Sequence, residues 1–280
     1  MGMAIMGNYP HGDKYWSENG VTDPTREDYI FHVEFNYFHN IGNGILTDFG
    51  AVYIGASGQV YCNTAPEKDV RKYCYSYAHV YNNLITGTQP FHGDYSVSLY
   101  SDEAVCRATF ENNIVYGSGG SPIHHHCGLD NVAKNNYIHR KAGISSPPKT
   151  MWAGCSKESP YQSYSNFHNI YLLDNADDFK FSERYYRFYN QAPDFYQNIY
   201  WSKQMEDQNL PMFPDQLTWD EWIQTGNDSN SLWTDPGFQN PDTGDYVLGE
   251  NSPAWELGIK QIQLDNFGVQ KSKSHPWISK

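Results

Sequence analysis

The sequence of 280 residues is poor in basic side chains. Lys and Arg together number 19, against 32 Asp and Glu, so the formal net charge is −13. Nucleic acids and anionic membrane surfaces are bound through clusters of Lys and Arg, and the sequence contains no basic stripe. We therefore expect neither nucleic acid nor a membrane as a partner.

Long apolar runs and paired cysteines are also missing. No run of 18 apolar residues occurs, which argues against a membrane-spanning helix, and the first residues lack the pattern of a signal peptide. No Cys-x-x-Cys spacing occurs, so a zinc ribbon is not expected. In an oxidising compartment two disulfides could form, Cys62–Cys74 and Cys106–Cys127, and Cys155 would keep a free thiol.

What the sequence does contain is a recurring asparagine. An Asn or Asn-Asn followed by a short apolar pair occurs in six segments, and Asn83, Asn113, Asn136, Asn169 and Asn198 are separated by 30, 23, 33 and 29 residues. The segments are 33–42, 79–88, 108–119, 131–143, 165–175 and 195–203. Such a spacing, with short alternating strands and little helical periodicity, is typical of stacked repeats.

The repeat predicts an all-β fold, a right-handed parallel β-helix. Asn tolerates the left-handed backbone of a sharp corner, and its side chain can bond to the next repeat and form a ladder along the axis. A β-sandwich would instead need hairpin signals between paired strands, and the single Asn-Gly at 19–20 lies outside the repeats.

The pattern also suggests three regions. Residues 1–29 are an N-terminal lead-in, and earlier repeats could lie outside this chain. Residues 30–204 form the β-helix, and residues 205–280 form a capping segment with one short helix, because Trp219, Trp222 and Ile223 have helical spacing after a potential cap at Thr218. The turn-rich tail that follows is expected to cover the last repeat.

Four motifs resemble one family. TDFGAVYIGASG (47–58), SLYSDEA (98–104), IHHHCGLDNVAKNN (123–136) and DPGFQNPDTGDYVLGENSPAWELG (235–258) are similar, in this order, to motifs of the β-helical glycoside hydrolases of family 141. The resemblance implies that Asp48 and Asp102 are the catalytic carboxylates. Departures from the family pattern at Ala51, Ala104, Val105, Cys127 and Leu129 bear on activity rather than on the fold.

The strand pattern indicates which side chains share a face. Side chains alternate along a strand, so Val97 and Leu99 point inward while Tyr100 and Asp102 point outward. By the same rule Ile123 and His125 point inward, and His124 and His126 point outward. Neighbouring strands lie about 4.8 Å apart, which suits the carboxyl separation of about 5–9.5 Å found in glycosidases. The candidate substrate-binding residues are Glu103, His124, His126, Tyr100 and His92.

The triple histidine, His124–His126, has three readings. A metal site is the least favoured, because adjacent strand residues face opposite sides and at most two could bind one ion. The others are a structural role and a polar subsite that bonds sugar hydroxyls or orients a carboxylate. We expect neither a metal nor another cofactor.

The function favoured by these patterns is hydrolysis of a polysaccharide or oligosaccharide by paired carboxylates, with a carbohydrate as the partner. Two alternatives stay open. One is a polysaccharide lyase of the same fold, which needs a basic proton acceptor and often Ca²⁺; the other is a non-catalytic carbohydrate-binding or structural β-helix. The substrate class predicts an extracellular or secreted protein.

Overall fold

The structure is a computed structural model, and the part of the chain that it describes is mostly β-sheet with one short α-helix. It describes residues 3–7, 30–43, 45–46, 48–56, 77–89, 96–102, 105, 107–126, 130–141, 152–154, 164–174, 194–202, 213, 217–263 and 267–268. Most of these residues belong to three parallel sheets, which we call A, B and C. The predicted β-rich, parallel architecture is confirmed at this level. All five cysteines lie outside the described residues.

Sheet A has five strands, in the order in which they occur along the chain: β1 (Met3–Gly7), β4 (Phe49–Ala56), β7 (Ser96–Asp102), β10 (Ser121–His126) and β13 (Trp152–Gly154). Sheet B has six: β2 (Ile30–Glu34), β5 (Tyr77–Tyr81), β8 (Ala108–Glu111), β11 (Asn131–Lys134), β14 (Tyr164–Phe167) and β16 (Asp194–Tyr196).

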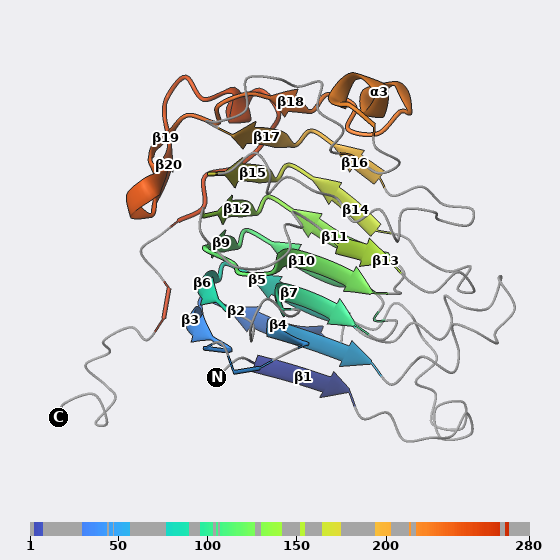
Figure 1. Cartoon of the computed structure of the whole chain (residues 1–280), viewed down its shortest axis with the longest axis vertical. Coiled ribbons are helices and arrows are strands. Elements are labelled where there is room, and N and C mark those ends of the chain that lie inside the picture. Colours follow the sequence, from blue (N-terminus) through green and yellow to red (C-terminus); the bar gives the residue numbers. More distant parts are fainter. Residues whose placement is uncertain are drawn as a thin grey trace, which may run out of the picture.

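Sheet C has seven strands: β3 (Tyr37–Ile41), β6 (Leu84–Thr88), β9 (Ile114–Tyr116), β12 (Tyr137–Arg140), β15 (Ile170–Leu173), β17 (Ile199–Ser202) and β18 (Leu232–Trp233). Within each sheet neighbouring strands are parallel and follow chain order, so the strands are stacked along the long axis of the molecule (Figure 1). We call each B strand, together with the C strand that follows it and the A strand before it where one is described, a strand set.

The start and the end of the chain extend this stack further than the sequence indicated. The lead-in 1–29 contains β1, which pairs with β4 from Met3 opposite Val52 to Gly7 opposite Ala56. The segment after residue 204 contributes β18, which pairs with β17. Neither carries the Asn signature of the repeat, because β1 belongs to sheet A, away from the B–C corner, and Ser231 takes the place of the ladder Asn before β18, where its Oγ accepts from Asn198 N.

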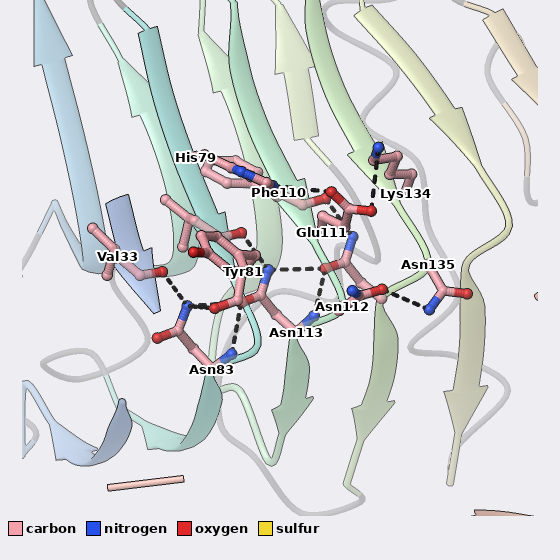
Figure 2. Close-up of polar contacts among 12 residues, drawn as sticks. Val33, His79, Tyr81, Asn83, Phe110, Glu111, Asn112, Asn113, Lys134 and Asn135 are labelled. Atoms are coloured by element: carbon pink, nitrogen blue, oxygen red, sulfur yellow. Dashed lines mark hydrogen bonds and ion pairs between the residues drawn. The ribbon is translucent and has the colours of Figure 1, made fainter. Parts of the chain in front are cut away.

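The corner between sheets B and C is built by a ladder of asparagines. From Asn83 onward, each ladder Asn Oδ1 accepts hydrogen bonds from the backbone N and the Nδ2 of the Asn in the preceding strand set; for Asn113 as acceptor and Asn83 as donor the distances are 3.1 and 2.9 Å (Figure 2). Asn83 Nδ2 also donates to the carbonyl oxygen of Val33, at 2.8 Å. The six members are Asn36, Asn83, Asn113, Asn136, Asn169 and Asn198.

The left-handed backbone at this corner falls one residue earlier. The residues with positive φ are Phe35, Asn82, Asn112, Asn135, His168 and Gln197, each just before a ladder Asn. The sequence analysis assigned both tasks to one asparagine, whereas the structure divides them between two adjacent positions. The ladder position needs the amide, while the left-handed position only favours Asn, and three of its six residues are of other types.

A buried carboxylate ends the ladder. Asp228 is 0% exposed, and its Oδ1 accepts from Asn198 Nδ2 at 3.1 Å and from Ser231 Oγ at 2.8 Å. Its Oδ2 accepts from Trp222 Nε1 at 2.7 Å, and the Tyr200 hydroxyl lies 3.0 Å from both oxygens. Burial raises the pKa of Asp228, although these donors act in the opposite direction.

The predicted helix is α3 (Trp219–Gln224), and its predicted cap is confirmed. Thr218 forms a capping box with Glu221, because its hydroxyl accepts from Glu221 N and Thr218 N donates to the Glu221 carboxylate. Trp219 and Trp222 are buried and pack with Phe213 in the core cluster that the three sheets enclose. The helix therefore covers the last strand sets of the core (Figure 1).

The C-terminal segment covers the outer face of sheet C. It contains the antiparallel pair β19 (Phe238–Asn240) and β20 (Asp245–Leu248) and two 3₁₀ helices, η7 (Pro241–Thr243) and η8 (Pro253–Trp255). Its apolar side chains form one buried cluster with outward residues of sheet C, and the cluster includes Ile114, Tyr137, Ile170, Ile199, Tyr246, Leu248, Leu257, Ile259 and Ile262. The sequence predicted a tail over the last repeat, whereas these contacts run along sheet C from Ile114 of β9 to Ile199 of β17.

Candidate functional site

Three strands of sheet A bring the predicted segments side by side. The register places Tyr53 of β4 opposite Tyr100 of β7, and Tyr100 opposite His124 of β10. Ile54 and Leu99 belong to the core cluster, so the alternation that the sequence predicted turns the tyrosines and His124 outward. The residues that the motifs suggested therefore share one face of one sheet.

Asp102, the last residue of β7, is the centre of this face. The Tyr53 hydroxyl donates to Asp102 Oδ2 at 2.5 Å, and His126 Nδ1 donates to Asp102 Oδ1 at 2.5 Å. The Asp102 side chain is 8% exposed, whereas that of His126 is 30% exposed. Both carboxylate oxygens are thus fixed by neighbouring strands, and the imidazole connects the buried carboxylate to the surface.

Asp48 lies at the corner that leads into β4. Its φ of 48° places it in the left-handed region, which Asp tolerates better than most residues. It is exposed, yet the surrounding protein desolvates part of the carboxyl group and this raises its pKa. The negative charge of Asp102 raises the pKa further, and His126 lowers it. Asp48 is therefore close enough to Asp102 and His126 for the three charges to act on one another.

Tyr100 and His124 are covered rather than open. They are 4% and 3% exposed, and their rings stack at a centroid distance of 4.8 Å and an interplanar angle of 18°. Tyr53 packs edge-on against Tyr100 at 4.9 Å. The sequence pattern predicted that these two side chains contact a substrate, but in the structure they form an aromatic layer beside Asp102.

The middle histidine lies on the other side of the strand, as alternation predicted. His125 is 3% exposed and stacks on Phe110 with an interplanar angle of 11°; its Nδ1 lies 2.7 Å from Ser101 Oγ. Burial lowers the pKa of His125 to about 3, so the ring is neutral at physiological pH. The triple histidine is therefore split between the core and the outer face.

Of the remaining residues around this face, two that the sequence predicted are not described, and one that it did not predict contacts Asp102. Glu103 and His92 lie outside the described residues. Tyr53 was not among the predicted site residues, although it donates the hydrogen bond to Asp102 Oδ2. The outward position of Tyr53 follows from alternation in AVYIG (51–55), but its partner depends on the register between β4 and β7, which the sequence alone does not provide.

The arrangement suits acid–base chemistry. An acid with a raised pKa, Asp48, stands near a carboxylate, Asp102, whose two oxygens are held by hydrogen bonds, and this is how pairs of carboxyl groups divide acid and base roles. A partly exposed histidine bonded to a carboxylate is a second potential proton acceptor. Among the residues that the structure describes, one trio of metal-ligating side chains converges, and it lies on sheet C instead.

Comparison with known proteins gives no match: no family model, no curated protein and no solved structure is similar to this chain. Within the described part of the chain, no helix combines the length and the apolar character that a bilayer crossing requires. Function can therefore be inferred only from the geometry of the face around Asp102.

Proposed function

We propose that this protein is a carbohydrate-active right-handed parallel β-helix, and specifically a glycoside hydrolase of the family 141 type. Three parallel sheets that each gain one strand per strand set support the β-helix. The main support for a hydrolase is the arrangement on the outer face of sheet A. There Asp102 accepts hydrogen bonds from Tyr53 and His126, and partial burial together with the charge of Asp102 raises the pKa of Asp48.

The proposal assigns a role to each carboxyl group. Asp48 is the general acid, because its raised pKa keeps a larger fraction of the group protonated for donation to the leaving oxygen. Asp102 is the base or nucleophile, because the hydrogen bonds from Tyr53 and His126 fix a carboxylate in one orientation. His126 positions Asp102. The substrate would be a polysaccharide or oligosaccharide, and the protein would act outside the cell.

The test is an assay of purified protein against aryl glycosides and plant or algal polysaccharides. We expect hydrolysis, with a loss of about 100-fold or more in turnover for Asp48→Asn and for Asp102→Asn. Asp130→Asn is a matched control, because Asp130 also has a left-handed backbone (φ 55°) at the corner before β11, and Asn tolerates that conformation. Hydrolysis that survives in both site variants would contradict the proposed roles.

The lyase alternative has one supporting observation, the Asp102–His126 hydrogen bond, because a histidine oriented by a carboxylate can remove a proton from a uronic acid. The same assay separates the two reactions. A lyase releases unsaturated products whose ultraviolet absorbance rises during the reaction, whereas a hydrolase releases reducing sugars only. Binding of a polysaccharide without any product would favour the non-catalytic alternative.

A further inference from the structure

A second polar cluster lies on the outer face of sheet C, remote in sequence from the face around Asp102. It consists of His139, Asp174 and Asp242, and we call it the sheet C cluster. His139 is in β12, Asp174 directly follows β15, and Asp242 is in η7 of the C-terminal segment. One ligand atom from each residue, a ring nitrogen or a carboxylate oxygen, lies within 4.8 Å of the other two.

The imidazole of His139 is fixed from both sides. The ring is 1% exposed; its Nδ1 lies 2.9 Å from the Tyr246 hydroxyl, and its Nε2 lies 2.8 Å from Asp174 Oδ1. Tyr246 is itself 1% exposed. The buried hydroxyl therefore holds the ring so that Nε2 points at the carboxylates.

Asp242 is held at the cluster by a hydrogen bond to its backbone carbonyl oxygen. The Tyr116 hydroxyl donates to the carbonyl oxygen of Asp242 at 3.4 Å, which anchors η7 over β9. Asp242 and Asp174 both act electrostatically on Lys141, whose Nζ lies 3.8 Å from Asp174 Oδ2 and 5.3 Å from the centre of the Tyr116 ring. Two carboxylates and a histidine from three separate segments thus converge beside one ammonium group.

We propose that the sheet C cluster binds a divalent zinc ion through His139 Nε2 and one carboxylate oxygen each of Asp174 and Asp242. Three atoms within 4.8 Å of one another leave a central point no more than about 2.8 Å from any of them, and small side-chain rotations bring this to the 2.0–2.2 Å of zinc bonds. Water completes the tetrahedron on the open side, where Asp242 is exposed.

The ligand set favours zinc over calcium. Ca²⁺ takes six to eight oxygen ligands, whereas one imidazole with two carboxylates is a donor set that zinc accepts. Metal-bound histidines almost always donate their second ring N–H to a neighbouring acceptor. With zinc on Nε2, the Nδ1–H donates to the oxygen of Tyr246, so the partner that orients the ring is already in place.

The ion would connect the C-terminal segment to two consecutive strands of sheet C. Asp242 belongs to the covering segment, while His139 and Asp174 belong to the sheet beneath it. The site would therefore stabilise the cover, and this role is independent of any hydrolysis at Asp102.

Titration calorimetry of the intact chain with ZnCl₂ tests the proposal. We expect one ion per chain and an affinity weakened at least about tenfold in Asp242→Asn, because an exposed ligand is removed without disturbing the buried ring. Asp220→Asn is the matched control, since Asp220 is an exposed aspartate of α3 outside the cluster. Circular dichroism of each variant verifies the fold.

A second measurement locates the ion. The ¹⁵N resonances of the imidazoles are followed during the titration, and we expect the ring of His139, identified by its loss in His139→Gln, to shift at Nε2. The chain has 11 histidines, so zinc could also bind elsewhere. The proposal is overturned if no saturable binding occurs, if Asp242→Asn binds as tightly as the wild type, or if the His139 ring does not respond.

Discussion

The corner between sheets B and C and the outer face of sheet A are built by the same repeat, yet they differ in one respect. At the corner, the same residue recurs in six consecutive strand sets and makes the same bonds each time. On the face of sheet A, one register row holds Tyr53, Tyr100 and His124, and Asp102 occupies the position next to Gly55. The position that holds the fold together has the same residue in every strand set, whereas the residues available for chemistry differ from one strand to the next.

The largest expected effect concerns the corner. In Asn136→Ala, the backbone N and Nδ2 of Asn113 lose their shared acceptor and the carbonyl oxygen of Phe110 loses its donor, all in a buried environment. Each buried unsatisfied group costs about 1–3 kcal/mol, so we expect the free energy of unfolding in urea to fall by about 3–5 kcal/mol.

The control for the corner is Asn240→Ala. Asn240 is exposed and its side chain makes no capping bond to η7, so we expect a change below about 0.5 kcal/mol. A loss of less than about 1 kcal/mol in Asn136→Ala would mean that the ladder is not what holds the corner.

The second prediction concerns the inner side of the histidine strand. The pKa of His125 is lowered by burial to about 3, while the unfolded chain keeps the usual value near 6.5, so below pH 6.5 the unfolded state binds more protons. The wild type therefore loses stability as the pH falls towards 3, by about 2 kcal/mol between pH 6.5 and 4.5 from this residue.

The comparison variant is His125→Phe, which keeps a ring between Phe110 and Tyr164 but does not titrate. We measure its free energy of unfolding in urea at several pH values. Between pH 6.5 and 4.5 we expect this variant to lose less stability than the wild type, and the difference to equal the contribution of His125. An identical pH dependence in the two proteins would place the His125 ring in contact with water.

The third prediction concerns Tyr53 on the outer face of sheet A. Tyr53→Phe removes the hydrogen bond to Asp102 Oδ2, and we expect the proposed hydrolysis to slow by about tenfold, because Asp102 loses one of the groups that hold it in its orientation. Stability should change by less than about 1 kcal/mol, since Tyr53 is only half-buried. Tyr196→Phe, an outward tyrosine of sheet B, should change neither quantity. A large loss of stability in Tyr53→Phe would show that Tyr53 serves the fold rather than the orientation of Asp102.

The smallest effect is expected two residues from the ladder. Glu111 lies on the outer face of sheet B, 2.9 Å from His79 Nε2 and 3.2 Å from Lys134 Nζ (Figure 2). These partners lower the pKa of Glu111, the His79 hydrogen bond most, but exposed pairs contribute little to stability. We expect Glu111→Gln to change the free energy of unfolding by less than about 0.5 kcal/mol, and this difference to shrink further at high salt.

The ladder was predictable because its cause is local and repeated. Asn136 can be recognised without knowledge of the rest of the chain, since an Asn followed by a short apolar pair also occurs at Asn113 and Asn169. Alternation likewise predicted that His125 points inward and His126 outward, because period two is a property of any strand. The parallel, β-rich architecture followed from the first regularity, and the division of His125 and His126 between two faces from the second.

The partners of Asp102 were less accessible to sequence reasoning. The Tyr53 bond depends on the register between strands whose bonded side chains lie 49 residues apart. The bond between His139 and Tyr246 spans 107 residues and depends on how the C-terminal segment crosses sheet C. Neither distance carries a periodic signal, so only the assembled sheets reveal them.

The asparagine ladder has one further consequence, for the length of the molecule. Each inner rung accepts from the rung before it and donates to the rung after it, so the row has a direction and each rung can follow any other. The ends differ: Asn36 is the first of the six rungs, and at the far end Asn198 donates to Ser231 Oγ and to the Asp228 carboxylate. A duplication or deletion of one whole strand set within the row would leave every junction chemically unchanged. Proteins of this design can therefore change in length by complete repeats, while a shift of a single residue would break the row.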